Sequence, residues 1–242
     1  MVWVLIIPAA ILVVRNRPEE IGLYPDGSFE PVEEPGGEVP AEGRTFWRVV
    51  ASMDFWFLAL ALAAGPFVVT ALVFHQISIL DGHGLSPGAA AGVFVPFAAA
   101  SAAGTALSGA LVERLGPKAT LIVSLGLLLA AVLGLQLVST VPTAIVYSVL
   151  LGAAAGTQGV VAGMIWAHFY GRAGLGRVQG PATMVMISSA ALAPLPLAAL
   201  RQLSGDYSLG LLMMAVIPVA CAVMTRLFDP ERARRDVEAL QP

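Results

Sequence analysis

The chain contains long stretches without any Asp, Glu, Lys or Arg, and these stretches limit the folds open to it. They lie at residues 55–80, 82–112, 119–171, 178–200 and 207–225. A helix that crosses the ~30 Å hydrocarbon core of a bilayer needs about 20 predominantly apolar residues. Each stretch can therefore supply one crossing, and 119–171 can supply two, because a turn signal at 139–142 divides it.

We therefore predict an all-α integral membrane protein that forms a six-helix transmembrane bundle. The spans are expected near residues 54–78, 89–111, 118–138, 142–167, 179–200 and 207–226. The composition agrees, because only 12% of the residues are charged, against about 25% in ordinary soluble domains. A formal net charge of -3 offers no basic surface, so no nucleic-acid partner is expected. The single cysteine excludes a disulfide scaffold.

The segments outside the bundle differ from it in composition. Residues 1–14 are apolar but would rise only about 21 Å as a helix, so we interpret them as a truncated transmembrane helix whose beginning is missing. A signal peptide is the alternative, although no positive region precedes this segment. Residues 15–48 are rich in Pro, Gly and Glu, which indicates a solvated cytoplasmic linker. The bundle then occupies 49–228, and 229–242 form a charged cytoplasmic tail.

Positive charges gather on one side of the predicted membrane. Twelve of the 13 Lys and Arg residues lie in the linker, the loops at 112–118 and 168–178, or the C-terminal end, and Arg201 alone lies opposite. Under the positive-inside rule these segments are cytoplasmic, whereas the loops around Asp81 and Asp206 face outward. Arginine outnumbers lysine, which is typical of a GC-rich bacterial genome. We therefore expect a multi-pass protein of the plasma (inner) membrane with a cytoplasmic C-terminus.

One short cytoplasmic loop resembles a family signature. Its key residues are Gly109, Glu113, Arg114, Gly116 and Lys118. Their spacing resembles the G-x-x-x-D-R-x-G-R-K loop of the major facilitator superfamily, which lies between helices 2 and 3 and has a weaker copy between helices 8 and 9. The loop departs from this pattern in two ways, because Glu113 replaces the family's Asp and a proline follows Gly116 where a basic residue is usual.

Two further stretches extend the resemblance along the chain. Residues 17–27 are similar to the central loop after helix 6, and residues 169–180 resemble the loop between helices 10 and 11. The order implies the C-terminal half of a major facilitator fold, with a stub of helix 6, the central loop and helices 7 to 12. Residues 74–76 followed by 84–86 look most like the branch of organic-anion and monocarboxylate porters.

The predicted spans differ in polarity. Those at 118–138 and 207–226 are almost entirely Leu, Ala, Val, Met and Ile, so they can face lipid. The other four carry hydroxyl, amide or small side chains, and the resemblance implies that helices 7, 8, 10 and 11 line the solute cavity. The candidate cavity residues are Thr70, Ser101, Thr105, Ser108, Thr157, Gln158, Ser188 and Ser189. In the alternative interpretation these side chains serve only to hold helices together.

Small residues also recur at helical spacing in the fourth span, where they permit close contact with another helix. These helix-packing candidates are Gly152, Gly156, Gly159 and Gly163. Thr157 and Gln158 are expected to point away from this glycine face.

The spans place no charged residue at mid-membrane depth, so this half offers only neutral hydrogen bonds to a solute. No nucleophile with a base and no set of metal ligands is visible, so no catalytic residue, metal or cofactor is expected. We therefore expect a secondary transporter, or its C-terminal half, that moves a small solute by alternating access. Its partners would be the lipid bilayer, the solute, and a missing N-terminal six-helix half or a homodimer partner. A non-transporting membrane scaffold, a decayed fragment and a membrane-embedded enzyme are the alternatives.

Overall fold

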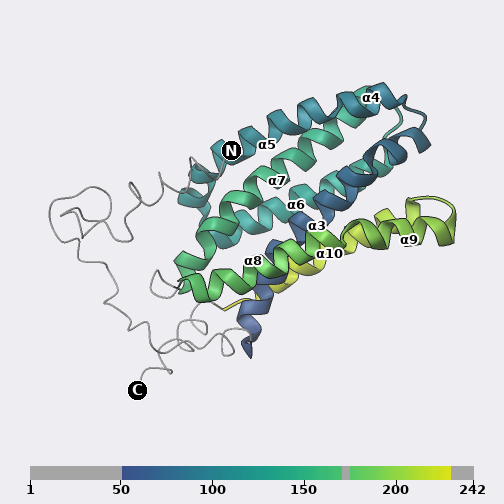
Figure 1. Ribbon diagram of the computed structural model, residues 1–242. Coiled ribbons are helices and arrows are strands. Elements are labelled where there is room, and N and C mark those ends of the chain that lie inside the picture. The colour runs from purple at the N-terminus through teal and green to yellow at the C-terminus, as the bar shows by residue number, and fades with distance from the viewer. Residues whose placement is uncertain (1–50, 171–174, 230–242) are drawn as a thin grey trace, which may run out of the picture. The chain divides into compact units, whose positions relative to one another are not determined.

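The computed structural model describes residues 51–170 and 175–229, and the regular secondary structure of these residues is helical (Figure 1). They belong to one compact unit, Ala41–Pro242. The predicted truncated helix at 1–14, the linker at 15–48 and all of the tail after residue 229 lie outside the described residues.

The six predicted spans are confirmed as helices that are long and apolar enough to cross a membrane. The helices are α3 (Met53–Gly82), α4 (Pro87–Gly92), α5 (Phe94–Leu115), α6 (Pro117–Gln136), α7 (Val141–Tyr170), α8 (Leu175–Leu192), α9 (Pro194–Ser204) and α10 (Ser208–Leu227). The fold is therefore the predicted all-α membrane bundle, consistent with half of a major facilitator fold.

Two of the spans are divided into two helices each. The second span breaks at Val93 between α4 and α5, and the fifth breaks at Ala193 between α8 and α9. A proline follows each break, Pro96 three residues after Val93 and Pro194 directly after Ala193, and proline lacks the N–H that would continue the helical hydrogen bonding. Pro194 occupies the first turn of α9, where no intrahelical N–H bond is needed.

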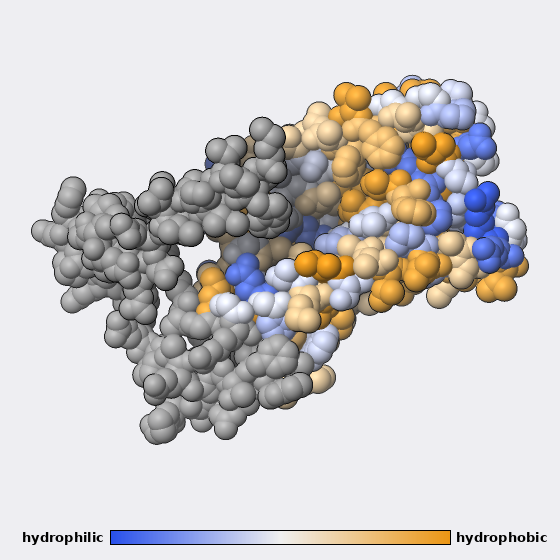
Figure 2. Space-filling view, viewed as in Figure 1, coloured by the Kyte–Doolittle hydropathy of each residue, from blue (hydrophilic) through white to orange (hydrophobic). Residues whose placement is uncertain are grey.

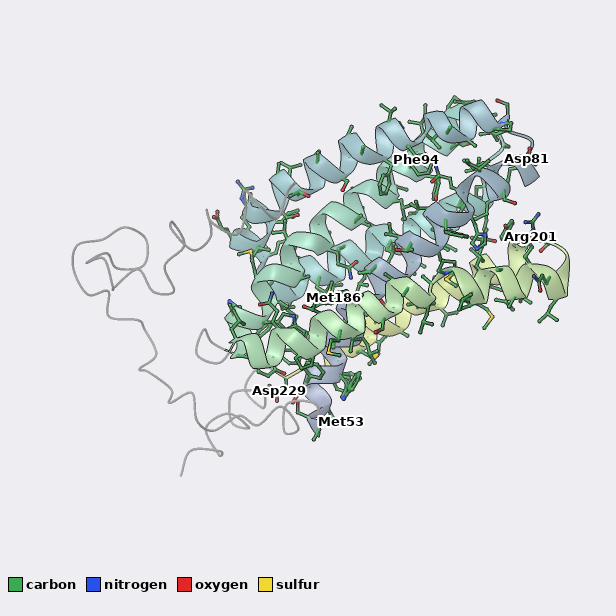
Figure 3. The ribbon with its side chains drawn as sticks, in the orientation of Figure 1. Met53, Asp81, Phe94, Met186, Arg201 and Asp229 are labelled. Atoms are coloured by element: carbon green, nitrogen blue, oxygen red, sulfur yellow. The ribbon has the colours of Figure 1, made fainter. Side chains whose placement is uncertain are left out.

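Successive spans run in opposite directions, so the turns gather at two ends of the bundle (Figure 3). Asp81 and Arg201 lie at one end, which we call the Asp81 end. Met53 and Asp229 lie at the other, which we call the Lys118 end because Lys118 there contacts the residues after α10. Figure 2 shows apolar residues along the helices and hydrophilic residues at the Asp81 end.

α3 and α7 form the centre of the bundle. α7 packs against α5 and α6, α3 packs against α8 and α10, and α10 packs against α6. In the most apolar 18-residue segments of α3 and α7, 56% of the residues are buried, whereas the buried share of the corresponding segments is 11% in α4–α5 and in α8–α9. The two divided spans therefore lie at the periphery and leave most of their side chains uncovered. In α6 and α10, the two spans that consist almost entirely of aliphatic residues, the buried share is intermediate, at 44% and 39%, because each helix buries one face.

The core consists of two apolar clusters. One lies toward the Asp81 end and includes Val68, Leu135 and Tyr207. The other lies toward the Lys118 end and includes Phe55 and Trp166. Along α3 the change from one cluster to the other falls at residues 65–67, and along α7 it falls between residues 154 and 161. Two of the buried polar side chains, Thr157 and Gln158, lie at this boundary.

Candidate functional site

α5 and α7 pack against each other through glycines. A Cβ atom added to Gly104 would lie 2.8 Å from Ala153 O, and one added to Gly156 would lie 2.9 Å from Thr105 N. Gly152 lies against the backbone of α5 in the same way. Backbone atoms cannot rotate aside as side chains do, so a larger residue at these positions would separate the two helices.

Gly159 and Gly163 have a different environment from Gly152 and Gly156. Both are exposed, and the position that a Cβ would occupy has no neighbouring atom within 4 Å. The 3.6-residue period places all four glycines on one side of α7, but the contact with α5 does not continue past Gly156 to the other two. Gly159 and Gly163 therefore lie on a part of α7 that this unit leaves uncovered.

Two of the candidate hydroxyls of α5, those of Thr105 and Ser108, donate to backbone carbonyls. The Thr105 hydroxyl donates to Ser101 O at 3.0 Å and lies 3.5 Å from Gly156 O. The Ser108 hydroxyl donates to Gly104 O. Ser108 is buried, Ser101 is half-buried and Thr105 is exposed. Because the hydrogens of the Thr105 and Ser108 hydroxyls are engaged, these two hydroxyls can offer a solute mainly their oxygen lone pairs.

Thr157 and Gln158 lie inside the bundle, each with 3% of its surface exposed. The side-chain amide of Gln158 points from α7 toward α3. Its Nε2 donates to Ala61 O at 2.9 Å and to Leu62 O at 3.2 Å. The amide therefore joins the two central helices near the boundary between the apolar clusters.

The remaining candidates are more accessible. Ser188 is exposed on α8, and Thr70 is half-buried on α3. The Ser189 hydroxyl lies 2.7 Å from Met186 O and 3.2 Å from Ala63 O, so it links α8 to α3. The structure thus brings Ser189 and Gln158 to neighbouring carbonyls of α3, whereas Ser101, Thr105 and Ser108 lie on α5.

A cavity of about 310 Å³ lies between α3, α7 and α8. Its lining residues are Pro66, Ala162, Gly163, Trp166, Gln179, Thr183, Met186, Ile187 and Ala190. None of the eight candidate cavity residues is among them. Gly163 does line the cavity, although it was expected to pack against another helix. Figure 3 shows Met186 on α8, between the two ends of the bundle. Among the described residues that line the cavity, none is charged, and Gln179 and Thr183 supply polar side chains.

The cavity residues of α8 carry a signal that a search for hydroxyls does not detect. Gln179, Thr183, Met186, Ile187 and Ala190 follow one another at helical spacing and so share one face. Their types are mixed, so polarity alone does not mark them as a group. Only the placement of α8 beside α3 shows that this face borders a cavity.

The loop signature contains one side chain with a clear structural role. Lys118 Nζ donates to Phe228 O at 2.6 Å and to Arg226 O at 3.3 Å, and it lies 5.8 Å from the centre of the Phe228 ring. A cation beside the last carbonyls of a helix also interacts favourably with the helix dipole. Lys118 therefore fixes the end of α10 against the start of α6.

The other signature residues surround a tight turn. Gly116 ends α5 and precedes α6 with φ 80°, a conformation that side-chain-bearing residues adopt rarely. Glu113 and Arg114 are exposed in the last turn of α5, and Gly109 is half-buried. Within the described residues, the signature thus contributes a turn and a helix contact rather than a buried charge pair.

A polar network joins three helices at the Asp81 end. His75 Nε2 donates to Pro194 O at 3.1 Å, and this bond requires the hydrogen to be on Nε2. His75 Nδ1 can then accept from the Tyr207 hydroxyl at 3.3 Å, whose oxygen accepts from Arg201 Nη1 at 3.0 Å. The network holds the break between α8 and α9 against the end of α3 and the start of α10.

The sequence of this helical bundle matches a known family. Residues 56–241 match the model of the Major Facilitator Superfamily, which is more than half of the chain. The chain belongs to the major facilitator superfamily. Members of this superfamily are generally membrane transporters, so the bundle is a multi-pass membrane protein of a transporter family. No curated protein matches the chain. The predicted membership of the superfamily is confirmed, whereas the organic-anion and monocarboxylate branch stays a prediction.

Proposed function

We propose that this chain forms one six-helix bundle of a secondary transporter that moves a small, uncharged solute by alternating access. The observation that carries the solute class is the neutral cavity between α3, α7 and α8. Secondary transporters bind solute near the bilayer midplane, between bundles or repeats that rock against each other. A solute at this cavity would contact Trp166 and Met186 with its apolar part and would form hydrogen bonds with Gln179 and Thr183.

The uncovered helices support a second bundle as partner. α4–α5 and α8–α9 bury few of their residues within this unit. Nevertheless α5 carries the exposed Thr105, α8 carries the exposed Ser188, and two glycines of α7 are exposed as well. Small and hydroxyl side chains on an uncovered helix face are typical of contacts between membrane helices. We infer that an N-terminal six-helix half or a second copy of the chain covers this side and completes the cavity. Charged groups for ion coupling would then come from that partner.

Uptake into proteoliposomes tests the proposal. The chain would be reconstituted alone and together with a six-helix N-terminal half, and a panel of a sugar, an aromatic amide, a monocarboxylate and a quaternary ammonium would be assayed. We expect saturable uptake of an uncharged solute only when two bundles are present. Uptake of the charged solutes alone would contradict the solute class. Hydrolytic or transferase turnover without uptake would contradict transport, and no uptake in any arrangement would favour a scaffold.

Two substitutions locate the site. Thr183→Val and Trp166→Ala should raise the KM for uptake, because they remove a hydrogen-bonding group and an apolar wall of the cavity. Thr140→Val is the control, since Thr140 is exposed in the turn before α7 and does not line the cavity. An unchanged KM in both cavity variants would place the solute elsewhere.

A further inference from the structure

α3 contains a backbone carbonyl that its own helix cannot satisfy. In a helix the N–H of residue 66 would donate to Leu62 O, but residue 66 is proline and has no N–H. The proline ring also pushes the preceding carbonyls outward. Gln158 Nε2 donates to Leu62 O at 3.2 Å and to Ala61 O at 2.9 Å. A side chain of α7 thus replaces the hydrogen bond that Pro66 removes from α3.

The residue before the proline makes room for this amide. A Cβ atom on Gly65 would overlap Gln158 Oε1 and would lie 3.1 Å from Nε2. Any larger residue at position 65 would therefore displace the amide from the carbonyls. Gln158 Oε1 is itself buried and has no hydrogen-bond partner among the described residues. The contact is thus held by the two N–H groups of the amide alone.

Two other helices reach the adjacent carbonyls. The Ser189 hydroxyl of α8 lies 3.2 Å from Ala63 O, and the Cys221 thiol of α10 lies 3.6 Å from Leu60 O. Four successive carbonyls, at residues 60–63, are therefore contacted by side chains from α7, α8 and α10. Pro66 removes the helical donor of Leu62 O alone, so the contacts to the other three carbonyls add to the helical hydrogen bonds of α3.

This segment also lies at the boundary between the two apolar clusters. The part of α3 before Pro66 packs in the cluster of the Lys118 end, and the part after it packs in the cluster of the Asp81 end. α6, α7 and α10 also pass through both clusters, so a bend of α3 at Pro66 would move its first part relative to these helices. The polar contacts that such a bend must break are those from Gln158, Ser189 and Cys221 to residues 60–63.

We propose that Gln158 is a positioning residue that controls a hinge in α3: its amide holds Ala61 O and Leu62 O, the second of which Pro66 leaves without a helical donor, and its release lets the two parts of α3 turn about the proline. The hinge within the bundle follows from these contacts, and its use in solute transport rests on the proposed function. The sole cysteine of the chain, Cys221, is 6% exposed and faces this segment, so its thiol reports when the segment opens.

The first test compares two substitutions of a buried glutamine. In nanodiscs, Gln158→Met should increase the rate at which a membrane-permeant maleimide labels Cys221 by about three- to twentyfold, the range that corresponds to measured interhelical hydrogen bonds in membranes. Gln76→Met is the control, because Gln76 is also buried on α3 and donates to one carbonyl, Ala90 O, at 3.3 Å. We expect that variant to leave the labelling rate unchanged. Equal rates in the two variants would overturn the proposal.

The second test is a double-mutant cycle. Pro66→Ala restores an N–H that can donate to Leu62 O within α3, so Gln158→Met should accelerate labelling much less in that background. Hydrogen exchange of the amides at residues 64–69 should follow the same pattern. Additive effects of the two changes would show that Gln158 does not serve the freed carbonyl. If Gln158→Met does not fold, Pro66→Ala alone should slow labelling of Cys221, and an unchanged or faster rate would overturn the hinge.

These readouts need no solute, so they distinguish a failed hinge from a failed transport assignment. Where uptake is measurable, Gln158→Met should change the turnover rate and leave KM unaltered, because Gln158 does not line the cavity. A raised KM with constant turnover would assign it to solute binding instead.

Discussion

Replacing Gly156 by alanine should separate α5 from α7. Its Cβ atom would overlap Ser101 O and lie 2.9 Å from Thr105 N, both of which belong to the backbone of α5. Since those atoms cannot rotate away, α5 must shift as a body. Gly152 and Gly104 contact the same helix pair, so the shift would also loosen their packing.

The magnitude follows from two opposing terms. Overpacking of a tight contact costs about 1–3 kcal/mol. Alanine in place of glycine within a helix stabilises it by about 0.5–1 kcal/mol. The difference between the two terms is a loss of about 0–2.5 kcal/mol in the free energy of unfolding for Gly156→Ala. For a chain of this size, that loss lowers Tm by roughly 2–4 °C for each kcal/mol.

Gly159→Ala supplies the matched control on the same helix. Gly159 is exposed and has no atom within 4 Å of the added Cβ, so only the helix-propensity term applies. This variant should gain about 0.5–1 kcal/mol and raise Tm. The same glycine-to-alanine change is therefore expected to lower the free energy of unfolding at position 156 and to raise it at position 159.

The assay is thermal unfolding of the purified chain in detergent, followed by tryptophan fluorescence and checked by reversible SDS titration. Both variants must show helical circular dichroism close to the unchanged chain before their stabilities are compared. If Gly156→Ala is stabilised as much as Gly159→Ala, α5 does not approach α7 as described. If both are destabilised, Gly159 is covered in the isolated unit as well.

Three further predictions concern the ends of the bundle. Lys118→Met should lower the free energy of unfolding by about 1–2 kcal/mol, because the carbonyl of Phe228 loses a charged donor. Arg114→Met, at an exposed position, should change it by less than about 0.5 kcal/mol in the same titration. Tyr207→Phe should speed hydrogen exchange in α9, because it removes the hydroxyl between Arg201 and His75, and equal exchange would show that the network does not hold α9. A tag inserted beside Asp206 should react with an impermeant reagent on intact cells, and protection there would reverse the predicted orientation.

The membrane bundle could be predicted from the sequence because its main constraint acts along the chain. A backbone in lipid must satisfy its hydrogen bonds within a helix, so an uncharged apolar stretch of sufficient length determines a span and its approximate ends. The turn near 139–142 and the alternation of spans followed from the same rule, and both are present. Prolines lie beside the breaks at Val93 and Ala193, but Pro66 and Pro218 leave α3 and α10 unbroken, so a proline alone does not predict a break.

The tertiary structure decided which face of each helix meets which neighbour. Periodicity placed Gly152, Gly156, Gly159 and Gly163 on one side of α7, but only the path of α5 separated the packed pair from the uncovered pair. Helical spacing likewise could not show that Gln158 reaches α3 or that Gln179 borders a cavity. A one-dimensional pattern specifies an angle around a helix axis, whereas a contact also requires a second helix at that angle, and the position of that helix depends on packing throughout the bundle.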